Sequence, residues 1–188
     1  MPAYEKLMSE QGDKIGDLIA QARYLAEGNL PFSDKASGLL DIADHLCSTI
    51  TPYTPCVKQC NHCCHMAVSV SSYEAEMLSR YSGKPMATRG KTLEDMAEQR
   101  DDMLKYTGVP CTFLVEGKCS VYPVRPAVCR THHNLGYDEL NCRISGIGQE
   151  EMMTTPSLNL TEYSLVQSLT MLQYGCTFGD IRDFFPRS

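Results

Sequence analysis

The segment with the most distinctive chemistry reads Cys56-Val57-Lys58-Gln59-Cys60-Asn61-His62-Cys63-Cys64-His65. Four cysteines and two histidines fall within these ten residues. Thiolate and imidazole groups bind soft and borderline metals such as zinc and iron. Four more cysteines follow downstream, at Cys111, Cys119, Cys129 and Cys142. The sequence therefore predicts a small protein folded around a thiolate metal centre.

The spacing of these cysteines leaves several kinds of centre open. Three residues separate Cys56 from Cys60, and two separate Cys60 from Cys63. A two-residue gap is common where a backbone turn directs two thiolates to one ion. Cys63 and Cys64 are adjacent, and adjacent side chains diverge, so they suit two neighbouring metals or two positions around a cluster. Eight thiols can fill two four-thiolate zinc sites, ligate one iron–sulfur cluster with four thiols left over, or hold a more unusual multinuclear centre.

Composition narrows the class of protein. The chain has 188 residues and a formal net charge of −6, which disfavours a general nucleic-acid binder because phosphate contacts need a basic face. No apolar run is long enough to cross a bilayer, and Met1-Pro2-Ala3-Tyr4-Glu5-Lys6 has no apolar core of a secretion signal. We therefore expect a soluble cytoplasmic protein that uses neither nucleic acid nor membrane as a partner.

The ten cysteines are better explained by metal than by disulfides. Thiols stay reduced in the cytosol, where clustered cysteines more often bind metal. Ten cysteines in 188 residues also fall below the fraction of roughly 8–10% that marks a disulfide scaffold. Metal ions are therefore the partners that the composition indicates.

Apolar residues at helical spacing predict a mainly α-helical chain on both sides of the cysteines. A helix is expected over residues 4–27, with a weak point at Gln11-Gly12. A second, capped by Ser33 or Asp34, ends near residue 50 and carries Cys47 on its apolar stripe as a core thiol. Further helices are expected over 72–81, 92–106, 161–174 and, as a short docking helix, 178–185.

Local signals set the ends of these elements. Ser71 and Glu74 have the spacing of a capping box, and Gly175 is a C-terminal stop. Residues 113–115 and 120–122 flank Glu116-Gly117-Lys118, which predicts a β-hairpin that brings Cys111 and Cys119 near each other. Residues 130–150 are predicted to form a loop. Because a loop of this length with little regular structure is uncommon in a compact domain, we expect a metal to hold it in place.

The fold prediction is therefore mainly α. We expect a single domain over residues 1–188, with about five helices, a short β-hairpin and a core stapled by a cysteine-ligated metal centre. Its parts are an N-terminal helical part over about 1–50, a cysteine-cluster region over about 56–142 and a C-terminal helical part over about 155–188.

The order of the motifs resembles a known family. Cys56-x3-Cys60-x2-Cys63-Cys64 is followed by Cys111-Thr112-Phe113-Leu114, by Gly117-x-Cys119-Ser120-Val121-Tyr122 and by Arg125-Pro126-x2-Cys129-Arg130. This pattern is similar to that of the YkgJ-type cysteine-cluster proteins, to which a zinc- or iron-chelating CxxCxxCC domain is ascribed. The resemblance covers about half of the chain. It implies eight metal ligands: Cys56, Cys60, Cys63, Cys64, Cys111, Cys119, Cys129 and Cys142.

The family also contains larger relatives with another activity. A similar domain occurs in flagellin lysine N-methylases, where an iron–sulfur cluster is implied. The present chain has no glycine-rich nucleotide-binding loop that would support methyl transfer.

Other polar residues near the cysteines have weaker roles. His62 is expected not to bind metal because eight cysteines suffice, whereas His65 and His132 are reserve ligands for a Cys3His zinc site. Arg125 and Arg130 flank Cys129 and either donate hydrogen bonds to sulfur or backbone or lie at the surface.

The function expected from these features is metal binding. The centre would hold zinc or iron, an iron–sulfur cluster included, in a structural, storage or chaperone role. The alternative is an iron–sulfur-dependent enzyme or electron carrier that acts on a protein or peptide. We find no hydrolase motif, P-loop or paired-carboxylate signature, and we assign no catalytic residue.

Overall fold

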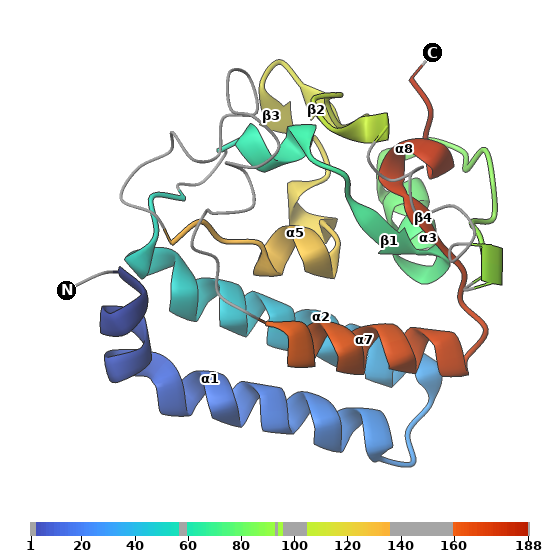
Figure 1. The fold of residues 1–188 in the computed structure, drawn as a ribbon. Coiled ribbons are helices and arrows are strands. Elements are labelled where there is room, and N and C mark those ends of the chain that lie inside the picture. The colour runs from blue at the N-terminus through green and yellow to red at the C-terminus, as the bar shows by residue number, and fades with distance from the viewer. Residues whose placement is uncertain (1–2, 57–59, 93, 96–104, 136–159, 188) are drawn as a thin grey trace. The chain divides into compact units, whose positions relative to one another are not determined.

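The computed structural model describes residues 3–56, 60–92, 94–95, 105–135 and 160–187, most of which lie in helices (Figure 1). The predicted mainly α class is therefore confirmed. The chain forms two compact units, of which the first comprises Met1–Lys58 and Arg130–Thr170. The second comprises Gln59–Cys129 and Met171–Ser188. The prediction of a single domain stays a prediction, as does a metal centre that staples the core.

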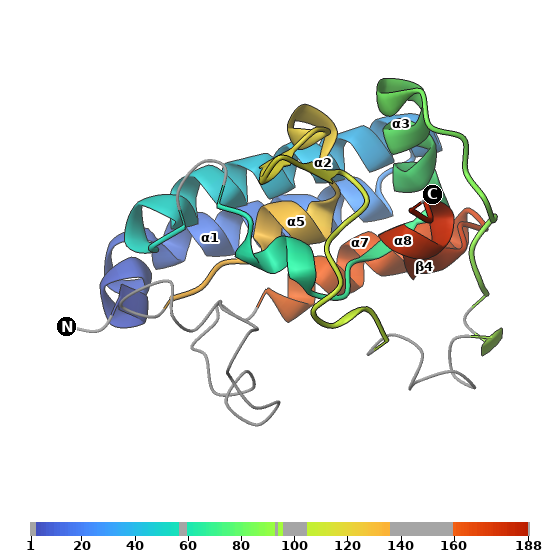
Figure 2. The same cartoon turned by 90° about the horizontal axis from the view of Figure 1, so that it is seen from above.

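Two long helices make up most of the first unit. Helix α1, Ala3–Glu27, and helix α2, Phe32–Ile50, lie side by side in both views (Figures 1 and 2). A Cβ atom at Gly38 would stand 2.6 Å from Cδ2 of Leu25, so the glycine lets the two helices approach closely. Lys35 supports their junction, because its Nζ donates a hydrogen bond to the carbonyl oxygen of Ala26 at 2.6 Å.

The ends of these helices partly agree with expectation. α1 continues through the predicted weak point, and Gln11 Nε2 donates a hydrogen bond to Tyr53 Oη at 3.3 Å. Tyr53 belongs to the 3-10 helix η1, Thr51–Tyr53, which directly follows α2. The predicted cap of α2 by Ser33 or Asp34 is wrong. The N-cap is Pro31, which has no capping side chain, so Ser33 and Asp34 already lie inside the helix.

Helix α7, Thr161–Gln173, agrees with the prediction for residues 161–174 to within one residue. Its residue Tyr163 is 1% exposed and belongs to the first unit. The Tyr163 hydroxyl donates a hydrogen bond to the carbonyl oxygen of Leu39 in α2 at 2.6 Å. The helix ends as predicted at Gly175, whose φ of 74° suits a residue without a Cβ atom.

The second unit contains a small antiparallel sheet that the sequence did not indicate. Strand β1, Ser69–Ser71, pairs with strand β4, Phe178–Asp180, so that Val70 lies opposite Gly179. Helix α8, Ile181–Phe184, follows β4 directly. The predicted helix over 178–185 is therefore wrong in its first half. The Asp180 side chain accepts a hydrogen bond from Arg182 N at 2.9 Å, which caps α8 and sets its start after the strand.

The predicted capping box is confirmed at the start of helix α3, Ser72–Ser82. Glu74 N donates to Ser71 Oγ at 3.3 Å, and Ser71 N donates to Glu74 Oε2 at 3.0 Å. Gly83 ends the helix with a φ of 71°. The apolar face of α3 contributes to the buried core of this unit, which is made of Val68, Val70, Ala75, Leu78, Cys111, Phe113, Val121, Ile181, Phe184 and Phe185.

The predicted hairpin is confirmed, but its second strand was placed wrongly at residues 120–122. The strand lies earlier in the chain, and Tyr122 begins the 3-10 helix η4, Tyr122–Val124. Strand β2, Leu114–Val115, pairs with strand β3, Lys118–Cys119. Glu116 and Gly117 have φ values of 50° and 74°, so the turn contains two residues in the left-handed region. A two-residue turn of this kind matches the twist of the strands, and for that reason Cys119 lies opposite Leu114.

Some predicted features lie outside the described residues. These are most of the helix over 92–106, the loop beyond residue 135 and Cys142. The start of the predicted helix is described, because Thr92 N donates to Asp95 Oδ2 at 3.0 Å and Asp95 N donates to Thr92 Oγ1 at 3.3 Å. Within the described ranges, no helix has both the length and the apolar character that a membrane span requires.

Candidate metal centre

The cysteine segment of the second unit is held in one tight turn. Residues His62–His65 form the 3-10 helix η2, in which Cys64 N donates to the carbonyl oxygen of Asn61 at 3.0 Å. Asn61 also ties the turn to the hairpin, since its Nδ2 donates to the carbonyl oxygen of Gly117 at 3.0 Å. The turn thus places the adjacent thiols Cys63 and Cys64 beside the β2–β3 hairpin.

A second cysteine segment is bonded directly to this turn through the backbone. Cys111 N donates to the carbonyl oxygen of Cys64 at 2.7 Å. Gly108 N donates in the same way to the carbonyl oxygen of His65 at 2.8 Å. Two segments that lie almost fifty residues apart in the sequence are therefore held side by side at their cysteines.

The remaining thiols come from the hairpin and from a short helix. Cys119 lies on β3, and Cys129 lies on helix α5, Ala127–Thr131. The start of α5 is anchored by Glu74, whose Oε1 accepts a hydrogen bond from Ala127 N at 2.8 Å. The capping box of α3 thereby also fixes the helix that carries Cys129.

Electrostatic interactions show that these thiols are close neighbours. Burial raises the pKa of Cys129, and ionised Cys63, Cys111 and Cys119 would each raise it further. The pKa of Cys64 is raised first by its hydrogen bond with Cys63, then by burial and by the charges of Cys63, Cys111 and Cys129. Ionising several of these thiols together is therefore unfavourable unless a cation compensates their charge.

One thiol of the group is poised to ionise. The hydrogen bond with Cys64 lowers the pKa of Cys63 to about 7, and the positive charge of Arg125 acts in the same direction. Arg125 also lowers the pKa of Cys119, although burial raises it by more. A thiolate at Cys63 among neutral thiols is a suitable first ligand, because metals bind the deprotonated sulfur.

The eight predicted ligands do not all lie in the same unit, and one of them lies outside the described residues. Cys63, Cys64, Cys111, Cys119 and Cys129 interact electrostatically in the second unit. Cys60 belongs to the same unit, Cys56 belongs to the first unit, and Cys142 lies outside the described residues. None of the nine cysteines that the structure describes forms a disulfide. Among the residues placed by the structure, no three Cys, His, Asp or Glu side chains have positions that would hold one ion.

Comparison with known families identifies the domain. Residues 55–158, more than half of the chain, match the family described as "CxxCxxCC: Putative zinc- or iron-chelating domain". The chain belongs to the CxxCxxCC family. No curated protein and no solved structure matches it. The donor set of the second unit fits this family, because thiols from η2, the Cys111 segment, β3 and α5 interact electrostatically there.

The histidines and arginines near the CxxCxxCC cysteines differ in their surroundings. His65 Nδ1 lies 3.3 Å from the carbonyl oxygen of Asn61. Burial lowers the pKa of His132, which belongs to the first unit. Arg130 forms an ion pair with Asp44 in the first unit. Arg125 stacks on Tyr122 with its guanidinium carbon 4.2 Å from the ring centroid. The reserve ligand roles of His65 and His132 stay predictions.

Cys47 and Cys176 have surroundings that differ from those of the clustered thiols. Cys47 Sγ lies 3.7 Å from Thr51 Oγ1 in the first unit. Burial raises the pKa of Cys176, and its hydrogen bond with Ser72 lowers it. No clustered cysteine contributes to the shift at Cys176. Both residues therefore remain outside the proposed ligand set.

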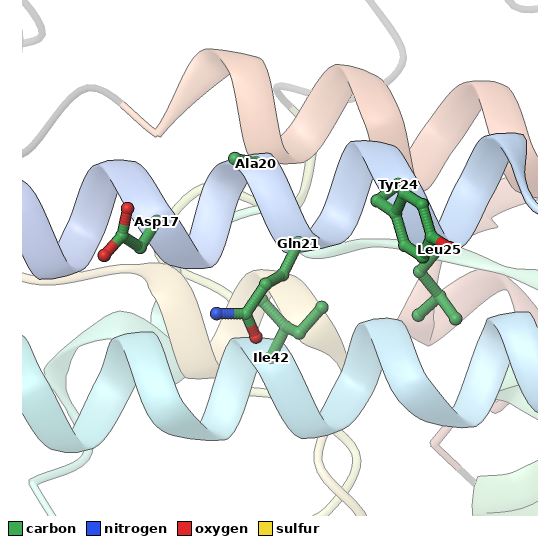
Figure 3. A pocket seen from close by; sticks show the side chains of 6 residues that line it. All are labelled: Asp17, Ala20, Gln21, Tyr24, Leu25 and Ile42. Atoms are coloured by element: carbon green, nitrogen blue, oxygen red, sulfur yellow. The ribbon is translucent and has the colours of Figure 1, made fainter.

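A pocket in the first unit lies away from any thiol chemistry. It has a volume of about 570 Å³ and is open along α1 and α2 (Figure 3). Its lining contains no cysteine or histidine and consists of Asp17, Ala20, Gln21, Tyr24, Leu25 and Ile42. We therefore do not include it in the metal centre of the CxxCxxCC domain.

Sequence reasoning missed the polar residues that support the cysteine segments. Asp180 and Arg182 form a buried ion pair at the start of α8, with exposed fractions of 3% and 4%. The sequence contains only a weak signal, because Asp180 and Arg182 stand two residues apart but Asp183 separates them from the apolar residues Phe184 and Phe185. Opposite charges can be buried as a pair where neither could be buried alone.

Proposed function

We propose that the protein binds zinc or iron through the eight cysteines Cys56, Cys60, Cys63, Cys64, Cys111, Cys119, Cys129 and Cys142, and that the metal orders the middle of the chain. The observation that carries this proposal is the meeting of five free thiols from separate segments within one CxxCxxCC domain. The thiols are buried or half-buried, and the charges of Cys63, Cys111 and Cys119 would all raise the pKa of Cys129, so a cation is the natural complement to the group.

A structural role follows from the energetics of this part of the chain. Ordering one backbone residue costs about 1–2 kcal/mol, and residues 51–64 carry few apolar side chains that could offset this cost by burial. Structural zinc sites contribute about 10–16 kcal/mol of apparent binding free energy in small peptides at neutral pH. Metal binding therefore offsets a large part of the cost of ordering these residues.

The test is metal analysis of the whole protein purified without oxygen. We expect a stoichiometric content of zinc or iron in the wild-type protein. Cys60→Ser and Cys129→Ser should each lower that content, because serine is a poor ligand for these ions. Cys47→Ala and Cys176→Ala are matched controls and should retain the wild-type content. Equal metal content in all four variants, or no metal in the wild type, would refute the proposed ligand set.

The same preparation separates the structural role from the redox alternative. A zinc protein is colourless, whereas an iron–sulfur protein absorbs visible light and releases sulfide in acid. Visible absorbance with acid-labile sulfide would favour an iron–sulfur enzyme or electron carrier. A storage or chaperone role would instead be favoured if the metal-free protein kept the protease resistance of the metal-bound form.

A further inference from the structure

Arg182 is a buried cation that binds the backbone of both central cysteine segments. Its residue is 4% exposed, and its Nη2 donates to the carbonyl oxygens of Met66 at 2.7 Å and Val109 at 2.8 Å. The same nitrogen lies 3.4 Å from the carbonyl oxygen of Cys64, and Nε lies 3.4 Å from that of Pro110. One guanidinium therefore bridges the segment around Cys64 and the segment that precedes Cys111.

Asp180 holds this guanidinium in place. Arg182 Nη1 donates to Asp180 Oδ1 at 2.8 Å and to Oδ2 at 2.9 Å. Asp180 Oδ2 also accepts a hydrogen bond from Val68 N at 2.7 Å, which ties the pair to the residues just before β1. The planar guanidinium is thus bound on two sides, by a carboxylate and by carbonyl groups, so that its orientation is fixed.

Arg182 contacts the backbone at or next to two of the proposed ligands. Its Nη2 contacts the carbonyl oxygen of Cys64, and its Nε contacts that of Pro110, the residue directly before Cys111. A group that fixes the backbone of two ligands holds their thiols in place, and loss of such support weakens metal binding. The Tyr106 ring also packs against the guanidinium, with its centroid 5.1 Å from the guanidinium carbon.

We propose that Arg182, anchored by Asp180, is a positioning residue of the metal centre. The inference rests on the proposed function and extends it beyond the CxxCxxCC domain, because the family match ends at residue 158. Arg182 joins the segment around Cys64 to the segment that precedes Cys111, so the two ligand segments are held together before metal arrives. The segment from β4 to α8 is accordingly part of the metal site, although it carries no ligand.

Three variants of the full chain test the proposal. Arg182→Lys keeps the charge but loses the planar fork, and Arg182→Met loses both. Arg80→Met is the matched control, because Arg80 is an exposed arginine of the same unit in an i,i+4 pair with Glu76. Zn²⁺ affinity is measured by competition with a chromophoric chelator. Loading with Co²⁺ in place of Zn²⁺ reports ligand geometry through the visible spectrum.

We expect Arg182→Met to weaken Zn²⁺ binding by about 10- to 100-fold, the usual effect of removing a group that supports a ligand. Arg182→Lys should lose less affinity but still change the Co²⁺ spectrum, and Arg80→Met should match the wild type. Hydrogen exchange at the Cys111 amide, which bonds to Cys64, should be faster in Arg182→Lys even without metal. This hydrogen-exchange measurement on Arg182→Lys tests the proposal even if Arg182→Met fails to fold.

The inference is overturned if Arg182→Lys keeps the wild-type Zn²⁺ affinity, Co²⁺ spectrum and Cys111 exchange rate. A wild-type protein that binds none of Zn²⁺, Co²⁺ and iron would refute the proposed function itself, and the inference with it. The two failures are distinguishable because one appears only in the variants and the other already in the wild type.

Discussion

Replacing Glu74 should damage both a helix and the metal centre. Its carboxylate is buried, with 4% of the residue exposed, and accepts three hydrogen bonds. Oε2 accepts from Ser71 N at 3.0 Å and Ser71 Oγ at 2.8 Å, whereas Oε1 accepts from Ala127 N at 2.8 Å. The first two bonds begin α3, and the third fixes α5 with its ligand candidate Cys129.

The expected loss of stability follows from the hydrogen-bond donors that each substitution leaves without an acceptor. Glu74→Ala leaves the backbone N–H groups of Ser71 and Ala127 without their acceptor, at about 1–3 kcal/mol each, or about 2–6 kcal/mol together. Glu74→Gln retains one acceptor oxygen and should lower the free energy of unfolding by about 1–3 kcal/mol. Small domains have only about 5–15 kcal/mol in total, so Glu74→Ala is expected to be severely destabilising.

The assay is urea unfolding followed by circular dichroism, at saturating metal and in the metal-free protein. Ser71→Ala removes only the capping hydroxyl and should cost about 1 kcal/mol. Glu76→Gln removes an exposed i,i+4 partner of Arg80 and should cost no more than about 0.5 kcal/mol. The reasoning is refuted if Glu74→Ala destabilises the protein no more than Ser71→Ala does. Loss of Zn²⁺ affinity in Glu74→Ala, without loss in Ser71→Ala, would show that α5 depends on this carboxylate.

Three further outcomes are expected. A strong chelator at mildly acidic pH, where protons compete for the thiolates, should expose residues 56–142 to protease. Most of the helical signal should remain, because α1 and α2 bury their own apolar faces. Unchanged protection from protease would argue against a structural metal. In the metal-free protein, the rate of Cys63 alkylation, measured by mass spectrometry, should rise with pH around a midpoint of about 7. The reason is that the pKa of Cys63 is lowered and the thiolate is the reactive form. A midpoint near the ordinary thiol pKa of about 8.5 would contradict the hydrogen bond from Cys64. Gly90→Ala should destabilise the second unit by about 1–3 kcal/mol in urea unfolding. A Cβ at this position would stand 2.7 Å from Phe184 Cζ, and the residue has a φ of +84°. Wild-type stability would show that the backbone around residue 90 shifts to accommodate the methyl group.

Local signals predicted much of the fold. The start of α3 could be read from Ser71 and Glu74 alone, because a capping box involves residues three apart. The ends at Gly83 and Gly175 follow from the same kind of rule, since both adopt the left-handed conformation. These interactions depend on near neighbours in the sequence, so tertiary packing had little opportunity to override them.

Pairings between distant segments could not be predicted in this way. β1 and β4 have three residues each, which is too short for an alternating pattern to be distinguished from the end of a helix. The candidate site shows the same division. Residue type and spacing identified the cysteines, but the hydrogen bond of Cys111 to Cys64 and the contacts of Arg182 depend on packing between segments that no local pattern specifies.

The pairing of β1 with β4 has a consequence for biosynthesis. Val68 and Asp180 are hydrogen-bonded across a sequence separation of 112 residues, so this part of the fold has a high contact order. Ribosomes add about 5–20 residues per second, and the thiols of η2 therefore leave the ribosome roughly 5–20 s before Asp180 is synthesised. During that interval the nascent chain presents Cys60, Cys63 and Cys64 without Arg182 or its anchor. Metal supplied after translation should consequently load the protein as fully as metal supplied during it.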